Sequence, residues 1–180
     1  LAKLAQYGIK GEVIGPQAIL IERPVPIESL PGFSAGEVSV QDAGAQLATP
    51  LLDVRPGMRV LDACAAPGGK TGHILELAEC ALTALDSDPA RAPRISDNLV
   101  RLGFPARVVC GDCSSPAEWS DGGLFDRILF DAPCTASGVV KRHPDVKWLR
   151  RESGIAQLAA TQSRMLDALW QQLAPGGKLL

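Results

Sequence analysis

Hydrophobic residues along this chain alternate between short runs and helically spaced sets, beginning at residue 58. The short runs have the length of buried strands and lie at 58–63, 81–85, 107–110 and 125–130. The helically spaced sets lie between and after them, at about 69–80, 89–102 and 153–173. A last apolar run at 178–180 follows two glycines and predicts one more strand. Strands that alternate with helices predict an α/β domain with a doubly wound, mostly parallel sheet.

The N-terminal part of the chain follows a different pattern. A short apolar run at 18–21 predicts a strand, and a proline-rich stretch at 24–31 then interrupts the chain. Apolar residues return to helical spacing at 45–52. The pattern therefore predicts two units, a small one at 1–35 and the α/β domain at 36–180.

Composition and charge indicate a folded protein and exclude several classes. Apolar residues make up 46% of the chain, which argues against disorder. No apolar run approaches the roughly 20 residues of a membrane span, and no signal peptide precedes the first strand, so we expect no membrane association. With a net charge of −2, any nucleic acid must bind at a local basic patch. Of the five cysteines, only Cys110 and Cys113 have C-x-x-C spacing, which predicts a reduced, cytoplasmic protein without a metal site.

The connection between the first strand of the α/β domain and its helix has the sequence LDACAAPGGKT, from Leu61 to Thr71. Its turn consists of small residues, so a ligand can approach the backbone and the free N–H groups of the helix N-terminus. A phosphate-binding P-loop needs glycine where Cys64 stands, and the dinucleotide fingerprint G-x-G-x-x-G is absent. The acidic residue followed by small residues resembles instead the S-adenosylmethionine loop of Rossmann-like methyltransferases. We therefore expect that cofactor to contact Cys64, Ala65, Ala66, Pro67, Gly68, Gly69 and Lys70.

Acidic residues close the four predicted strands, at Asp62, Asp86, Asp112 and Asp131. Ligands of a parallel sheet bind outside the carboxyl ends of its strands, so we expect these side chains to converge on one crevice. Asp86 is placed to accept hydrogen bonds from the ribose hydroxyls, and Asp112 from the adenine amino group. Asp131 is expected to hold either the methionyl ammonium of the cofactor or a substrate base.

The sequence DAPCTASG, at 131–138, bears on the reaction class. Methyltransferases that act on exocyclic nitrogens usually carry Asp or Asn, two prolines and an aromatic residue here, whereas this chain has Pro133 and Cys134. Carbon 5 of cytosine is too weakly nucleophilic to take a methyl group directly, so an enzyme must first add a thiolate to carbon 6. A cysteine near the positive charge of Lys70 suits that attack. Three other cysteines lie in apolar runs and are expected in the core: Cys64, Cys80 and Cys110.

A basic stretch follows at 139–151, with a single acidic residue, Asp145. Its basic residues are Lys141, Arg142, Lys147, Arg150 and Arg151. Together with Trp148 they predict contacts to RNA phosphates and stacking on bases. A solvated loop without a ligand is the alternative interpretation.

Several of these motifs together resemble the RNA cytosine-5-methyltransferases, the family of the bacterial Sun/Fmu-like enzymes that act on ribosomal RNA. The resemblance is carried by DACAAPGGKT at 62–71, DAPCTASG at 131–138 and KRHPD at 141–145. VQD at 40–42 also resembles the start of the family's entry helix, which closes over the cofactor. The resemblance implies a monomeric enzyme with ribosomal RNA as its partner, in which residues 1–35 are the tail of a small α+β RNA-recognition subdomain.

The same resemblance implies roles for individual residues. Arg91 is a further cofactor contact, Lys70 and Asp131 reach the base, and Cys134 assists release of the product. In the family the nucleophile is a second cysteine, in a Thr-Cys-Ser motif that does not occur in this chain. We therefore expect a sheet truncated at its C-terminal strands and a fragment that is inactive alone. Two alternatives stay open, namely Cys134 as the nucleophile, as in the DNA enzymes, and a non-catalytic module that binds cofactor or RNA.

Overall fold

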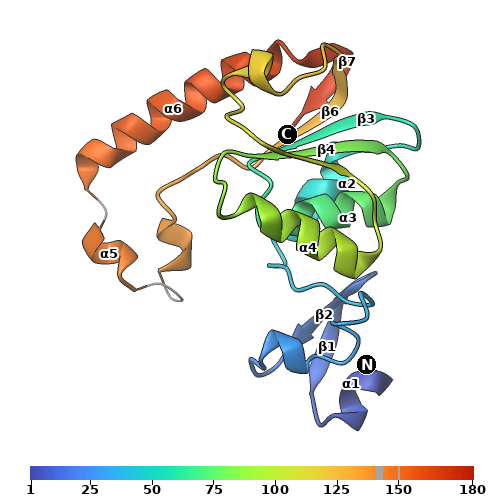
Figure 1. The fold of residues 1–180 in the computed structure, drawn as a ribbon. Helices are drawn as coiled ribbons and strands as arrows, with labels where there is room; N and C mark the ends of the chain where they lie inside the picture. Colours follow the sequence, from blue (N-terminus) through green and yellow to red (C-terminus); the bar gives the residue numbers. More distant parts are fainter. Residues whose placement is uncertain (141–143, 150) are drawn as a thin grey trace.

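Five parallel strands form the central sheet of the computed structural model, with helices on both faces (Figure 1). The structure describes residues 1–140, 144–149 and 151–180, and of residues 139, 147 and 149 the backbone alone. The strands are β3 (Arg59–Ala63), β4 (Ala81–Asp86), β5 (Arg107–Cys110), β6 (Phe125–Phe130) and β7 (Leu173–Leu179). They lie in the order β5-β4-β3-β6-β7, and each pair of neighbours is parallel. The doubly wound, Rossmann-like fold expected from the sequence is confirmed.

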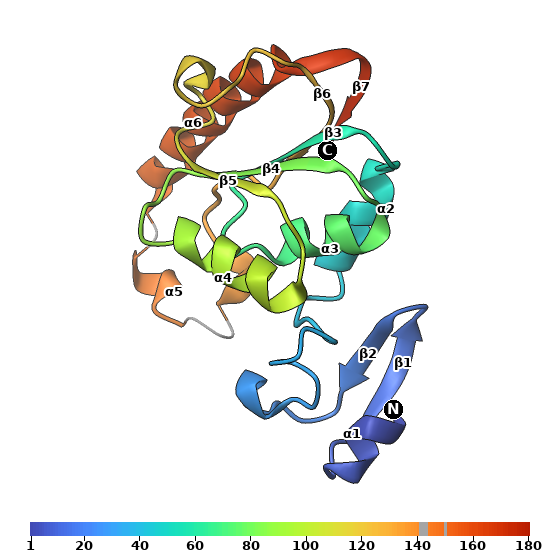
Figure 2. The same cartoon turned by 45° about the vertical axis from the view of Figure 1, so that its right-hand side comes forward.

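The helices cover the two faces of this sheet unequally. One face carries α2 (Ala48–Leu52), α3 (Gly69–Leu77) and α4 (Ala92–Leu102), and the other carries the long helix α6 (Glu152–Trp170) (Figures 1 and 2). The short helix α5 (Val146–Leu149) stands apart from the sheet in both views. Single 3-10 turns lie at η1 (Ile27–Ser29), η2 (Ala45–Leu47), η3 (Pro116–Glu118) and η4 (Ser137–Val139). Within the described residues, no helix has the length and apolarity needed to cross a membrane.

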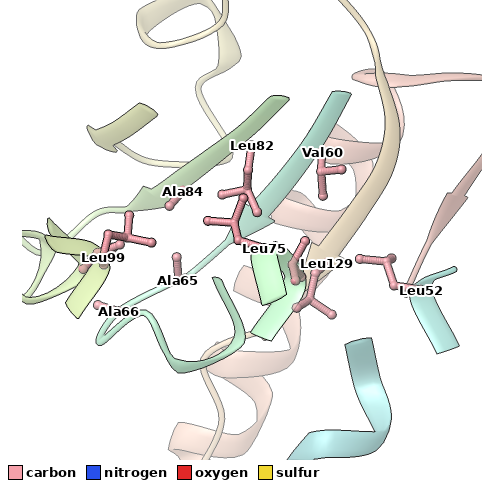
Figure 3. Packing of buried hydrophobic residues seen from close by; sticks show 11 residues of the cluster. Leu52, Val60, Ala65, Ala66, Leu75, Leu82, Ala84, Leu99 and Leu129 are labelled. Carbon is pink, nitrogen blue, oxygen red and sulfur yellow. The ribbon is translucent and has the colours of Figure 1, made fainter. Parts of the chain in front are cut away.

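Strands β3 to β6 supply side chains to two separate cores. Val60 and Leu61 are neighbours in β3 and both fully buried, yet they belong to different clusters. The cluster beside α3 and α4 contains Leu52, Val60, Ile74, Leu75, Leu82, Ala84, Ile95, Leu99 and Leu129 (Figure 3). The cluster beside α6 contains Leu61, Ala63, Leu85, Ile128, Met165 and Leu169. Successive side chains of a strand point to opposite faces, so a strand that is covered on both faces has an unbroken apolar sequence.

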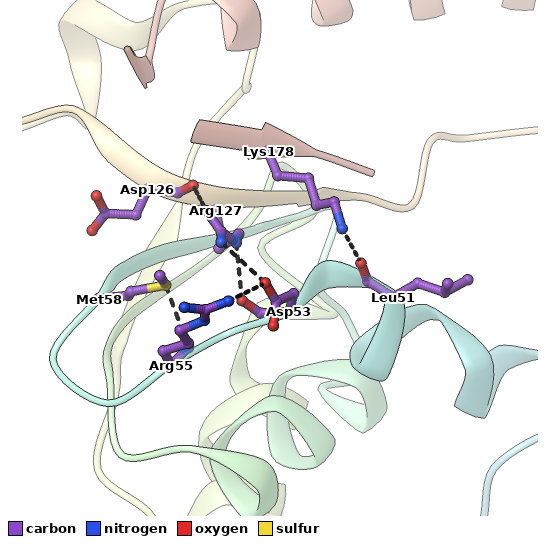
Figure 4. Close-up of polar contacts among 7 residues, drawn as sticks. All are labelled: Leu51, Asp53, Arg55, Met58, Asp126, Arg127 and Lys178. Carbon is purple, nitrogen blue, oxygen red and sulfur yellow. Dashed lines mark hydrogen bonds and ion pairs between the residues drawn. The ribbon is translucent and has the colours of Figure 1, made fainter. Parts of the chain in front are cut away.

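A polar cluster joins the end of α2 to the neighbouring strands β6 and β7 (Figure 4). Arg127 Nε donates to the carbonyl oxygen of Asp53 at 3.0 Å, and its guanidinium lies 3.5 Å from the Asp53 carboxylate. Lys178 Nζ donates to the carbonyl oxygen of Leu51 at 2.7 Å. The hydrogen bond from Arg55 holds the pKa of Asp53 below its usual range. These contacts hold the segment that enters β3, the strand that leads into the small-residue loop.

The N-terminal residues form a helix and a hairpin, α1 (Ala2–Gln6), β1 (Gly11–Gly15) and β2 (Ala18–Ile21). The strand at β2 was predicted, whereas β1 was not. Its only consecutive large apolar residues are Val13 and Ile14, which are too few to indicate a strand by pattern. Antiparallel pairing with β2 supplies the hydrogen bonds that its own sequence does not predict.

The C-terminal helix ends earlier in the chain than the sequence predicts, and the strand after it begins earlier. Helix α6 ends at Trp170 rather than near 173, and β7 begins at Leu173 rather than at 178. Gly176 and Gly177 lie inside β7, beside a sheet pairing whose register is irregular. Glycine has a weak strand preference, so hydrogen bonding to β6 rather than local sequence decides this strand. Helices α3 and α4 are also shorter than the ranges predicted for them.

Candidate active site

A pocket of about 220 Å³ opens where β3 and β6 end. It is lined by Val40, Gln41, Asp42, Asp62, Cys64, Ala65, Ala66, Pro67, Gly69, Lys70 and Asp131. Strands β4 and β5 follow β3 on one side of the sheet, whereas β6 and β7 lie on its other side. The pocket therefore lies at the topological switch point, where doubly wound sheets bind their ligands.

Most of the predicted loop residues line this pocket, but three further residues of the lining were not predicted as site residues. Val40, Gln41 and Asp42 come from the segment before the first turn of the α/β domain. The VQD motif was the available signal, and it was interpreted as the start of a helix. In the structure these residues are irregular backbone, and the turn η2 begins only at Ala45.

The loop is held in place by α4. Gly68 has φ +94°, and a Cβ at this position would lie 3.1 Å from the Cα of Ile95, so α4 packs directly on the turn. Arg91 Nη2 donates to the carbonyl oxygen of Ala66 at 2.6 Å, and Asn98 Nδ2 donates to that of Gly68 at 3.1 Å. Arg91, predicted as a cofactor contact, is outside the pocket lining and bonds to the loop backbone. Its direct contact with the cofactor stays a prediction.

Of the four strand-end aspartates, Asp62 and Asp131 line the pocket and the other two do not. Asp86 is buried under the loop, where Oδ2 accepts from the Ala66 amide at 2.9 Å and Oδ1 from the Asp88 amide at 3.1 Å. A carboxylate oxygen has a second lone pair, so contact with ribose stays a prediction. Asp112 is exposed at the end of β5, and its predicted role with adenine stays a prediction as well.

Asp62 is a fully buried carboxyl group beneath the pocket. Thr71 Oγ1 donates to its Oδ2 at 2.6 Å. The pKa of Asp62 is raised to about 7. Loss of hydration on burial is the main cause and the charges of Asp131 and Asp86 add to it, whereas Thr71 and Lys70 act against it. A carboxyl group that titrates near neutral pH in a pocket is typical of a functional site.

Lys70 and Asp131 form an ion pair at the pocket. Lys70 Nζ donates to Asp131 Oδ2 at 2.8 Å. Lys70 lies in the first turn of α3 and its side chain is largely buried, whereas Asp131 follows β6 and its side chain is exposed. The pair therefore bridges the switch point and places one cation and one carboxylate at the pocket's edge.

The cysteines are distributed differently from the prediction. Cys110 was expected in the core, and this was wrong, because it ends the edge strand β5 and is exposed. Cys64 and Cys80 are partly buried, whereas Cys113 is fully buried. Cys64 shares a hydrogen bond with Cys113, and this bond together with burial raises the pKa of the Cys64 thiol. Cys64 therefore stays protonated and is not an activated nucleophile.

Cys134 lies outside the pocket lining, on the exposed segment that follows β6. The Ala136 amide donates to its Sγ at 3.3 Å. Gln162 Nε2 of α6 donates to the carbonyl oxygen of Pro133 at 2.7 Å and ties this segment to the helix. The role of Cys134 in catalysis stays a prediction.

The structure describes only some of the residues predicted to contact RNA. Lys141, Arg142 and Arg150 lie outside the described residues, as does the side chain of Lys147. Arg151 is exposed just before α6, where it borders a second hollow of about 450 Å³. Its contact with RNA stays a prediction.

Known proteins resemble this chain in sequence and in fold. Residues 49–180 match the family described as 16S rRNA methyltransferase RsmB/F. The chain is 54% identical over 183 residues to ribosomal RNA small subunit methyltransferase B of Salmonella arizonae, covering 100% of this chain and 43% of that protein. The chain spans about two fifths of the length of the curated relatives it matches.

Two solved structures from Pyrococcus horikoshii share the fold. A methyltransferase homologue superposes with a TM-score of 0.81 at 31% identity, covering 99% of this chain and 57% of that one. NSun6, crystallised with SFG, superposes with a TM-score of 0.77 at 30% identity, covering 90% and 43%. The family match extends over the loop, the Lys70–Asp131 pair and the strands that position them. The chain thus belongs to the 16S rRNA methyltransferase RsmB/F family.

Proposed function

We propose that this chain carries the cofactor site and part of the catalytic groups of an S-adenosylmethionine-dependent RNA (cytosine-5-)-methyltransferase that acts on 16S ribosomal RNA. The observation that carries the proposal is the Lys70–Asp131 pair beside a pocket of small residues at the switch point. The names of the relatives support the reaction and the substrate. The structure of NSun6 with SFG, an analogue of S-adenosylmethionine, supports the cofactor.

The residues of the pocket fit this cofactor. A Cβ added at Gly69, which lines the pocket, would meet no atom within 4 Å, so a ligand has room against the loop backbone. The first N–H groups of α3 have no acceptor within the helix and suit the methionyl carboxylate. The carboxyl groups of Asp62 and Asp131 suit the methionyl ammonium. When bound, the cofactor supplies an electrophilic methyl group on a positively charged sulfur.

The ion pair is proposed to serve the substrate base. Asp131 can accept a hydrogen bond from the amino group of cytosine, and Lys70 keeps that carboxylate oriented. The positive charge of Lys70 also favours a thiolate over a thiol near the base. That thiolate is proposed to belong to a cysteine of a Thr-Cys-Ser motif, which this sequence of 180 residues does not contain. Cys134 then assists removal of the product.

The remaining parts are proposed to bind the RNA. Residues 1–35 would be the tail of an RNA-recognition subdomain, and the basic stretch would contact phosphates from Lys141, Arg142, Lys147, Arg150 and Arg151. The oligomeric state is proposed to be a monomer. Ribosomal RNA as the proposed substrate supports a cytoplasmic location.

Calorimetric titration with S-adenosylhomocysteine tests the cofactor site. We expect saturable one-to-one binding, and weaker binding when Lys70 is replaced by Met, because Lys70 then no longer holds the Asp131 carboxylate in position at the pocket. Absence of binding to the wild-type chain would contradict the proposal.

Incubation with S-adenosylmethionine and RNA containing 5-fluorocytosine tests the assignment of the cysteines. That base has no proton at carbon 5 to lose, so an attacking thiolate stays attached after methyl transfer. We expect this chain to form no covalent adduct. An adduct that forms with the wild type and is lost in C134A would instead identify Cys134 as the nucleophile, which is the second candidate mechanism.

A further inference from the structure

Arg101, at the C-terminal end of α4, contacts two separate parts of the structure. Its Nη1 donates to the carbonyl oxygens of Phe33 at 2.8 Å and Val38 at 3.0 Å. Its Nη2 donates to Oδ1 of Asn98 at 2.7 Å. The guanidinium also lies over the ring of Phe33, 4.1 Å from the ring centre. One side chain therefore binds the segment at 33–38 to the polar face of α4.

The backbone of that segment packs against the same end of α4. Gly36 has φ +74°, and a Cβ at this position would collide with the carbonyl oxygen of Arg101. Only glycine allows this conformation and this approach without strain. The segment is therefore held by close packing as well as by hydrogen bonds.

Asn98 extends these contacts to the cofactor loop. Its Oδ1 accepts from Arg101, and its Nδ2 donates to the carbonyl oxygen of Gly68 at 3.1 Å. Gly68 lies between two residues of the pocket lining. The segment bound by Arg101 continues from Val38 into 40–42, which form another part of the same lining. Two parts of the pocket are thus connected through two side chains of α4.

We propose that Arg101 is a positioning residue which, through Asn98, couples the order of the 33–42 segment to the geometry of the loop at Gly68. Arg101 is outside the pocket lining, so it acts through the residues it holds. The inference rests on the proposed function, because the ligand that links the two parts is the cofactor. Coupling of this kind is reciprocal: if an ordered segment strengthens binding, bound ligand must order the segment by the same factor.

Three variants test the coupling. R101M removes the bonds to Phe33, Val38 and Asn98. N98D is isosteric and keeps the acceptor for Arg101, but it places an oxygen against the carbonyl oxygen of Gly68. R94M is the matched control, because Arg94 is an exposed arginine of the same helix.

Binding of S-adenosylhomocysteine is measured by calorimetry. Hydrogen exchange is measured with and without that ligand at 33–38, the part of the segment outside the pocket lining. In the wild type we expect the ligand to slow exchange in the segment. R101M should bind about tenfold more weakly, within the usual range of coupling between sites, and its segment should exchange equally with and without ligand. N98D should lose affinity and ligand-induced protection too, while its segment without ligand exchanges as in the wild type. R94M should match the wild type in both measurements.

Wild-type affinity in R101M, or ligand-induced protection that persists in it, would overturn the positioning role. Failure of the wild type to bind S-adenosylhomocysteine would overturn the proposed function instead, so the two failures are distinct. If R101M does not fold, N98D decides alone: unchanged affinity and protection in N98D overturn the coupling, and their loss supports it. A protein whose stability alone depends on Arg101 would show weaker protection of the segment without any change in its response to ligand.

Discussion

Replacing Asp62 by Asn should remove a pH-dependent destabilisation of the fold. Burial raises the pKa of Asp62 to about 7, whereas its ordinary value, expected in the unfolded chain, is 3.8. Between these values the folded protein keeps a proton that the unfolded chain has released. The stability of the wild type therefore falls as the pH rises through this window, and the loss is complete above pH 7. Asparagine has no proton to lose there, so the variant lacks this dependence.

The magnitude follows from the width of the window. One pKa unit corresponds to about 1.4 kcal/mol, so the shift from 3.8 to about 7 corresponds to about 4 kcal/mol in full. About two pH units of that window, from pH 5 to about pH 7, lie within the range from pH 5 to pH 8. We therefore expect the variant to gain about 3 kcal/mol relative to the wild type over this range. The amide oxygen of Asn can still accept from Thr71, so this hydrogen bond is retained at both pH values.

Urea unfolding at pH 5, 6, 7 and 8, followed by circular dichroism without ligand, measures the free energy of unfolding. Asp121→Asn is the control, since Asp121 is exposed and its hydrogen bond with Arg59 lowers the pKa of that carboxyl. Its removal should change stability equally at every pH in the series. A constant difference between D62N and the wild type across the series would refute the argument, because it would mean that Asp62 is already ionised in the folded protein at pH 5.

Three further changes have defined outcomes. Lys70→Met removes a positive charge that lowers the pKa of Asp62, so the pH-dependent loss of stability should extend to higher pH in the same urea series. An unchanged pH range for this loss would mean that Lys70 has no effect on the pKa of Asp62. Asp86→Ala leaves the Ala66 amide without its acceptor, so it should lower the free energy of unfolding by about 1–3 kcal/mol and weaken binding of S-adenosylhomocysteine. Urea unfolding and calorimetry measure the two effects, and a variant with neither effect would contradict the role of Asp86 in supporting the loop. Arg151→Ala should lower the slope of log K against log salt for structured RNA by about 0.7 to 0.9, and an unaltered slope would mean that Arg151 contacts no phosphate.

The amino-acid sequence was sufficient to predict the α/β class, and it pointed to the carboxyl ends of the strands as the candidate site. Strands covered on both faces must be apolar throughout, so β3, β4 and β6 could be predicted from their composition and length. The loop at 64–70 could be predicted because small residues after a buried strand serve one purpose, close approach to the backbone. Asp131 could be named because it closes a predicted strand, and the ends of parallel strands meet at one edge. Lys70 was named from the resemblance of its loop to those of known methyltransferases.

Only the tertiary structure decided which residues lie together. Asp86 and Asp62 both follow the strand-end pattern, yet Asp86 lies under the loop, and Asp62 acquires its raised pKa from burial that no local pattern records. The link from Arg101 through Asn98 to Gly68 depends on side chains that converge after α4 packs on the loop. Local sequence predicts conformation over a few residues, whereas hydration, charge and hydrogen-bond partners depend on segments that folding brings together from distant parts of the chain.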